Sequence, residues 1–147
     1  MKKRTTSLLL LALLLLSMTA LFGCGKEEAA DVSIELGSSD IYDELTRQEA
    51  IEVIRDEIAH WDGVELHRVA YMGDEAITDE NLAWMNELGQ ANGRPEFAEV
   101  IGFTADYHTP KDEEKAGAWK PDTEMTDWQF WLARPEGGDW EVVTNGY

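Results

Sequence analysis

The stretch WQFWLARPEGGDWEVVTN, residues 128–145, contains two apolar runs separated by a short polar segment with two glycines. Residues 128–134 and 140–145 are rich in aromatic and β-branched side chains, which favour strands. Gly137 and Gly138 lie between the two runs and permit a tight turn. The stretch therefore predicts a β-hairpin near the C-terminal end of the chain.

An amphipathic helix is predicted earlier in the chain. Thr46 and Glu49 have the spacing of a capping box, in which both side chains bond to the backbone at a helix start. The apolar residues that follow recur at intervals of three and four and form one stripe, Ile51, Ile54, Ile58 and Trp61. Gly63 is expected to end the helix.

Shorter elements are predicted between the helix and the hairpin. Residues 64–72 favour a strand, and the alternation slips between Leu66 and Val69, which indicates a bulge. Thr78 is expected to cap a second helix that ends at Gly89. Residues 98–107 favour another strand, and residues 108–126, with two prolines and many charges, favour a long surface loop. One face of the second strand is apolar: Ile101, Phe103, Ala105 and Tyr107.

This order of elements predicts an α+β domain over residues 40–147. An N-terminal amphipathic helix would pack on an antiparallel sheet of about four strands, because each has one apolar face to bury. Cystatin-like and NTF2-like folds have this arrangement, an analogy that carries no function.

The first 23 residues have the pattern of a lipoprotein signal peptide. A basic start is followed by the leucine-rich run 8–16 and by Leu-Phe-Gly-Cys at 21–24, which resembles the bacterial lipobox. Phe22 departs from the small residue usual there. Cleavage before Cys24 would leave this cysteine lipidated at the start of a tether, residues 24–39. We therefore expect a partner in the membrane and a location at the extracytoplasmic face of a bacterial cell membrane.

Two alternatives compete with this interpretation. The apolar stretch 7–22 would be short for a transmembrane helix, which needs about 20 residues. The second alternative is a structural role for the cysteine. Cys24 is the only cysteine in the sequence, however, so no intrachain disulfide forms. A lipid anchor accounts for this single thiol.

The charge of the chain argues against several classes of partner. The formal net charge is −18, and removal of Lys2, Lys3 and Arg4 with the signal peptide leaves nine basic against thirty acidic residues, or −21. Such a surface repels nucleic acid and anionic headgroups. The acidity serves either solubility or cation binding, and diffuse carboxylates favour solubility.

Several short segments resemble an uncharacterised family of exported lipoproteins from clostridia and related Gram-positive bacteria. They are WMNELG (84–89), DYHTPK (106–111), GAWKPDTE (117–124), DWQFWLAR (127–134) and GGDW (137–140). The resemblance covers most of residues 41–147. It implies a compact domain at the cell surface, and it implies no activity and no catalytic residue.

The sequence contains no established catalytic or cofactor motif, and we expect no cofactor. Asp106 and His108 share one face of a strand and are a candidate for a general acid–base pair; the alternative is a polar strand end before Pro110. A candidate calcium site comprises Asp74, Glu75, Asp79 and Glu80. A turn followed by a helix N-terminus explains the same acids.

The tryptophans suggest a binding surface. Trp131 points to the face opposite Trp128 on its strand, and Trp119 lies in the long loop. Both are candidates for an exposed aromatic platform that binds a peptide, protein or glycan, unless the loop folds back and buries them. We therefore expect a non-catalytic binding domain; the alternatives are a small hydrolase that uses Asp106 and His108, or a structural envelope lipoprotein.

Overall fold

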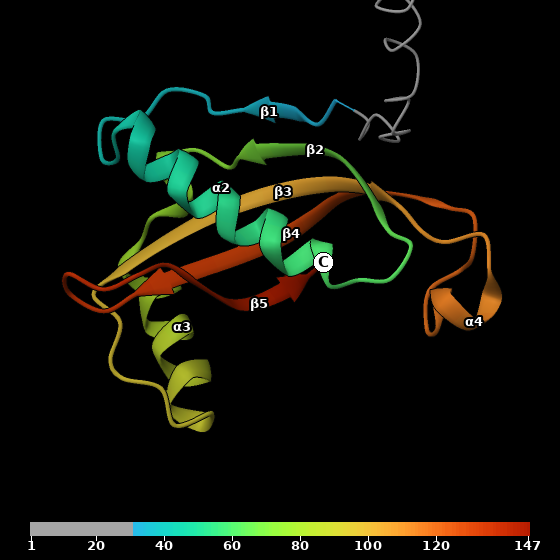
Figure 1. Ribbon diagram of the computed structural model, residues 1–147. Helices are drawn as coiled ribbons and strands as arrows, with labels where there is room; N and C mark the ends of the chain where they lie inside the picture. The colour runs from blue at the N-terminus through green and yellow to red at the C-terminus, as the bar shows by residue number, and fades with distance from the viewer. Residues whose placement is uncertain (1–30) are drawn as a thin grey trace, which may run out of the picture.

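The structure, a computed structural model, describes residues 31–147, which contain one five-stranded sheet and three α-helices (Figure 1). The strands lie side by side in chain order: β1 Ser33–Glu35, β2 Glu65–Tyr71, β3 Glu99–His108, β4 Glu124–Arg134 and β5 Glu141–Gly146. The helices are α2 Glu44–Ala59, α3 Asp79–Ala91 and α4 Glu113–Ala116, and a 3₁₀ turn covers Asp74–Ala76. The α+β class is as predicted.

The helix α2 lies across one face of the sheet (Figure 1). Its stripe residues Ile51, Ile54 and Ile58 are all buried, because the apolar positions recur with the helical period. The helix begins two residues before Thr46. Asp43 is its N-cap, and the Asp43 carboxylate accepts a hydrogen bond of 2.8 Å from the Thr46 amide. The cap is therefore Asp43 and not the Thr46 capping box.

Strands β2 to β5 are antiparallel, and the C-terminal hairpin is formed by β4 and β5 as predicted. The apolar face of β3 packs in the core beneath α2. Four alternate residues of this face are fully buried, namely Ile101, Phe103, Ala105 and Tyr107. The predicted irregularity in β2 is present as a register shift between Leu66 and Arg68. A second shift, between Ala105 and Tyr107, was not predicted.

The opposite face of the sheet is covered at one end by α3. Thr78 caps this helix, accepting a hydrogen bond of 3.1 Å from the Asn81 amide. A second apolar cluster forms between helix and sheet; its buried members include Met85, Phe97, Val100 and Trp131. The sequence predicted that α3 ends at Gly89, but this glycine lies inside the helix, which continues to Ala91. A Cβ there would be 2.6 Å from the Phe97 ring, so the glycine permits close packing.

The sheet has five strands and is mixed, where an antiparallel sheet of about four strands was predicted. The additional strand β1 pairs in parallel with β2, placing Ile34 opposite Val69. This strand lies within the stretch 24–39, which was predicted to be a tether. Residues 33–35 of that stretch are instead part of the sheet. All three β1 residues are exposed, and without a buried face the strand has no alternating pattern to recognise.

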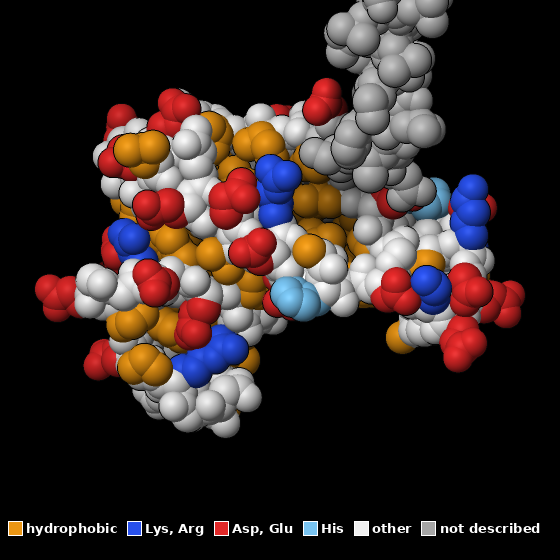
Figure 2. Space-filling view, viewed as in Figure 1, with side chains coloured by type: hydrophobic (Ala, Val, Ile, Leu, Met, Phe, Trp, Pro, Cys, Tyr) orange, Lys and Arg blue, Asp and Glu red, His pale blue; other side chains and the backbone are white. Residues whose placement is uncertain are grey.

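The predicted loop 108–126 is shorter than expected, because β3 extends to His108 and β4 begins at Glu124. The connection 109–123 contains the single-turn helix α4 at the far end of the molecule (Figure 1). Acidic side chains are spread over the side viewed in Figure 2, and several surround α4. The predicted signal peptide and the predicted lipidation site at Cys24 lie outside the described residues.

Candidate functional site

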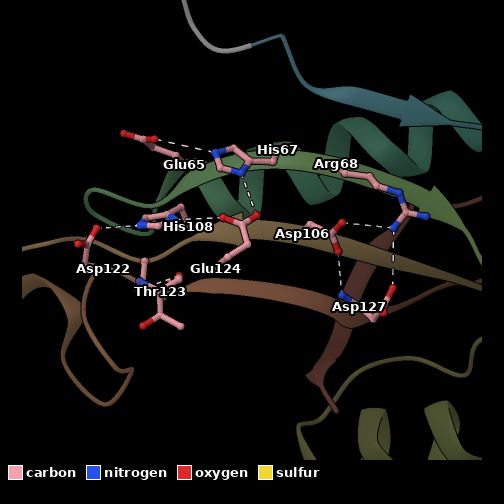
Figure 3. A network of polar contacts seen from close by, with 10 residues as sticks. Glu65, His67, Arg68, Asp106, His108, Asp122, Thr123, Glu124 and Asp127 are labelled. Carbon is pink, nitrogen blue, oxygen red and sulfur yellow. Dashed lines mark hydrogen bonds and ion pairs between the residues drawn. The ribbon is translucent and has the colours of Figure 1, made fainter.

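A polar surface covers the half of the sheet face that α3 leaves open. It is formed where β2, β3 and β4 run side by side, and we call it the polar face: His67, Arg68, Asp106, His108, Glu124 and Asp127 (Figure 3). The alternation of β3 places Asp106 and His108 opposite to the buried Ala105 and Tyr107. The extra residue in β2 turns His67 toward the same surface as Arg68.

Two histidines share one carboxylate in this surface. His67 Nδ1 lies 2.9 Å from Glu124 Oε1, and His108 Nδ1 lies 3.0 Å from Glu124 Oε2. The second ring nitrogen of His108, Nε2, lies 3.0 Å from Asp122 Oδ1. His67 Nε2 is 4.0 Å from Glu65 Oε2. His108 is thus held between two carboxylates, whereas His67 has one close carboxylate partner.

These contacts change the protonation of the network. Hydrogen bonds to Asp122 and then to Glu124 raise the pKa of His108 above its ordinary value. Both ring nitrogens face acceptors, and both donate only when the ring is the imidazolium cation. The hydrogen bond from His108 lowers the pKa of Asp122. Burial alone would raise the pKa of Glu124, but hydrogen bonds from His67 and His108 together lower it.

Arg68 organises the neighbouring part of the polar face. Its guanidinium binds the Glu35 carboxylate of β1 through Nε at 2.7 Å and Nη2 at 2.9 Å. Arg68 Nη1 lies 3.6 Å from Asp106 Oδ2 and 3.8 Å from Asp127 Oδ1. Asp106 also accepts a hydrogen bond of 2.8 Å from the Asp127 amide. Asp127 has φ of 55° at the bulge of β4, and this bond holds its left-handed backbone.

The predicted acid–base pair of Asp106 and His108 is not assembled. The two residues share a face, but Asp106 binds Asp127 and Arg68, while His108 binds Asp122 and Glu124. The physical reason is the bulge in β4, which brings a backbone amide to Asp106 and leaves Glu124 opposite His108. An enzyme that uses this pair is therefore not supported.

A shallow pocket of about 320 Å³ lies beside the two histidines. Its lining includes Glu65, Lys111 and Asp122, and the only hydroxyl in it belongs to Thr109. The Thr109 hydroxyl donates a hydrogen bond of 2.7 Å to the Lys120 carbonyl, and Thr109 as a whole is only 1 % exposed. The pocket thus offers carboxylates, imidazole nitrogens and the Lys111 ammonium, groups that hold and exchange protons, and its single hydroxyl is engaged in a hydrogen bond.

Trp131 and Trp119 do not form an exposed platform. Trp131 is 7 % exposed, because α3 covers it; the Trp84 ring stands edge-on at 5.8 Å. Trp119 is half-buried on the other side of the sheet, where its ring lies 5.2 Å from Trp61 and 5.9 Å from Tyr107. The loop folds back, as the alternative interpretation of the sequence allowed, and the two rings occupy opposite faces.

The acids proposed as calcium ligands serve local structure. The Asp74 carboxylate accepts hydrogen bonds from the Ser39 and Tyr71 hydroxyls, which lower the pKa of Asp74. Asp79 and Glu80 form the first turn of α3, where acids are favoured, and Glu75 is an exposed residue of the 3₁₀ turn. Within residues 31–147, no three His, Cys, Asp or Glu side chains gather around a possible metal position.

His67, Glu124 and Asp122 were missed as site residues. The slip in the β2 pattern indicated that His67 sits at an irregularity, but nothing in the sequence indicated its partner across the sheet. No helix in the described part of the chain is long and apolar enough to cross a membrane. Comparison with known proteins finds no matching family model, curated protein or solved structure.

Proposed function

We propose that this chain is a lipoprotein of the extracytoplasmic face of the cell membrane, held there by lipid on Cys24, and that its domain is a non-catalytic binding domain. The anchor is supported by the basic start, leucine run and lipobox-like residues 21–24. The segments quoted above support a relation to the exported lipoproteins of clostridia and related bacteria. The packing of α2 across strands β2 to β5 supports a cystatin-like or NTF2-like architecture, which by itself implies no function.

The polar face is the contact surface in this proposal. The observation that carries it is the excess of exposed carboxylates over cations on the polar face and in the adjoining pocket: the side chains of Asp127 on the face and of Glu65 and Asp122 in the pocket are 77 %, 73 % and 59 % exposed. Glu35, Glu124 and Asp106 add negative charge beside Arg68 and the two histidines. This distribution suits a positively charged partner.

A basic peptide or a basic segment of a protein fits this surface better than a glycan. Sugars stack on exposed aromatic rings, and here Trp131 is buried and Trp119 is packed against Trp61. Peptide ammonium and guanidinium groups instead pair with carboxylates. Among the expected partner classes, we therefore propose a basic polypeptide.

Binding is tested with the full chain in detergent micelles and fluorescent lysine-rich, glutamate-rich and neutral peptides. The lysine-rich peptide should bind, and added salt should weaken its binding because the charged contacts are exposed to solvent. The double variant Glu65→Gln/Asp127→Asn should bind several-fold more weakly. Glu136→Gln, in the hairpin turn, is the matched control and should bind like the parent. Equal binding of all three peptides, or equal loss in the control, contradicts the proposal.

The anchor has a separate test. Cells that express the chain with radiolabelled or clickable palmitate should label it and retain it in the membrane fraction. Cys24→Ser should abolish labelling, because no other cysteine is present. The variant protein should then either leave the membrane fraction or remain as an unprocessed precursor. Labelling that persists in Cys24→Ser would refute the lipid attachment without bearing on the polar face.

A further inference from the structure

His108 connects the end of β3 with two other parts of the chain. Its Nδ1 contacts Glu124, the first residue of β4, and its Nε2 contacts Asp122, which precedes β4 in the connection 109–123. The side chain of His108 is 29 % exposed, so protons reach it from solvent. The contact between Nε2 and Asp122 therefore ties this connection to the sheet through a group that titrates near neutral pH.

Asp122 is held in a backbone conformation that favours glycine. Its φ is 50°, in the left-handed region that costs free energy for a residue with a Cβ. The Asp122 amide donates 2.9 Å to the Pro110 carbonyl across the base of the connection. This turn leads directly from the segment that bears α4 and Trp119, whose ring packs on Trp61 and Tyr107.

We propose that the imidazolium form of His108 fastens Asp122, and with it the segment 111–122, to the sheet, so that loss of the ring proton loosens this segment. A neutral imidazole has a single N–H and cannot donate to both Glu124 and Asp122. Each neutral tautomer keeps only one of the two donors, so the hydrogen bond to Asp122 is present in only part of the molecules and loses the charge of its donor, which weakens a bond that holds the left-handed turn. The inference concerns the fold and does not depend on the proposed binding function.

The pH direction follows from the protonation of the network. The pKa of His108 is raised in the folded protein, chiefly by Asp122 and also by Glu124. Its contribution is therefore full below the ordinary histidine pKa and is lost as pH rises through the raised value. The lowered pKa values of Asp122 and Glu124 keep these acceptors ionised into more acidic solution. The segment is therefore fastened at pH values above the lowered pKa values of the two carboxyl groups and below the raised pKa of His108.

Other groups around His108 modify this behaviour. His67 competes for Glu124, since its Nδ1 contacts the other carboxylate oxygen. Glu65 and Lys111 line the adjacent pocket, and the positive charge of Lys111 also lowers the pKa of Asp122. His67 and His108 therefore share the Glu124 carboxylate, whereas Asp122 contacts only His108 among the histidines of the described residues.

The loosening is local because the base of the connection has bonds that do not titrate. The Thr109 amide donates 2.9 Å to the Thr123 carbonyl, and the Thr123 amide donates 2.9 Å to the Thr109 hydroxyl. At the far side, Lys115 Nζ lies 3.2 Å from Asp62 Oδ2. We therefore expect faster opening of residues 111–122 without unfolding of the sheet.

Hydrogen–deuterium exchange of the full chain in micelles tests the proposal. After correction for the intrinsic pH dependence of exchange, peptides that cover 111–122 should lose protection several-fold between about pH 5.5 and about pH 8.5. Asp122→Asn and His108→Gln should show low protection at both pH values. His60→Gln, on an exposed histidine outside the network, is the matched control and should keep the parent pH dependence.

Titration of the histidine ring protons by NMR gives an independent measurement. His108 should titrate above the ordinary histidine pKa of about 6.5 in the parent and closer to it in Asp122→Asn. Two results would overturn the proposal: an unchanged His108 titration in Asp122→Asn, or the same pH-dependent exchange of residues 111–122 in the parent and in His108→Gln. Either would show that the contact does not hold the segment.

Discussion

At the scale of single residues, Arg47 is the least expected feature of the core. It lies on the buried side of α2 and is 6 % exposed. Among the described residues, its Nε and Nη1 atoms have no hydrogen-bond partner. The guanidinium lies 5.5 Å from the centre of the Tyr71 ring, a cation–π contact that offsets part of the cost of burial. Unsatisfied buried donors nevertheless lower stability.

Replacement of this side chain gives a prediction about stability. Arg47→Met keeps an unbranched apolar stem and removes the buried donors, so it should raise the free energy of unfolding by about 1 kcal/mol. Urea denaturation followed by circular dichroism measures the change. Arg55→Met, on the exposed side of the same helix, is the control and should change stability by less than about 0.5 kcal/mol. A marked loss of stability in Arg47→Met would mean that the cation–π contact outweighs the desolvation.

Residues with left-handed backbone mark both sides of the site. Asp122 and Asp127 have φ of 50° and 55°, and each is tied to a side chain of β3, His108 for the first and Asp106 for the second. Neither tie is visible in the sequence, because aspartate in a loop suits many turns. These two contacts explain why Asp106 and His108, two positions apart, belong to different networks.

At the scale of elements, α3 shows how packing changes the role of a residue. Gly89 suggested a helix end from its position after Leu88, but the helix continues to Ala91. Asn92 follows as the C-cap, and Gly93 has the left-handed φ of 71°. The glycine that ends a helix is thus Gly93, while Gly89 leaves room for the Phe97 ring.

Substitution of Gly89 distinguishes the two roles. An added methyl group would favour the helix by about 1 kcal/mol, but its Cβ would lie 2.6 Å from Phe97 Cε2, in a side chain that is 2 % exposed and cannot move aside. Overpacking costs about 1 to 3 kcal/mol, so Gly89→Ala should lower stability. Gln90→Ala is the control. Addition of Phe97→Leu should recover the loss; a stabilised Gly89→Ala would contradict the packing argument.

At the scale of the whole molecule, the two faces of the sheet differ in polarity and in what covers them. The face under α2 is apolar along its length, from Ile101 to Tyr107. The other is apolar only beneath α3, and beyond Gly102 it becomes polar through Asp106 and His108. A single strand, β3, therefore contributes to the main core, to the second core and to the polar face. The half left open by α3 is available to a partner or to solvent.

Sequence patterns determined the elements that have one buried face. The stripe of α2 and the alternation of β3 follow from helical and strand periods, so Ile54 and Phe103 were correctly assigned to the core. The hairpin of β4 and β5 follows from two strand-forming runs around Gly137 and Gly138. The anchor at Cys24 also remains a prediction from sequence, since it lies outside the described residues.

The tertiary structure alone decided the composition of the site. His67, His108, Glu124 and Asp122 meet because two register shifts and a returning connection bring them together. Local periodicity reports which face a residue occupies, but it contains no information about which residue lies opposite on the next strand. For the same reason the burial of Trp131 depended on where α3 packs, and the strand β1, exposed on every residue, left no pattern to detect.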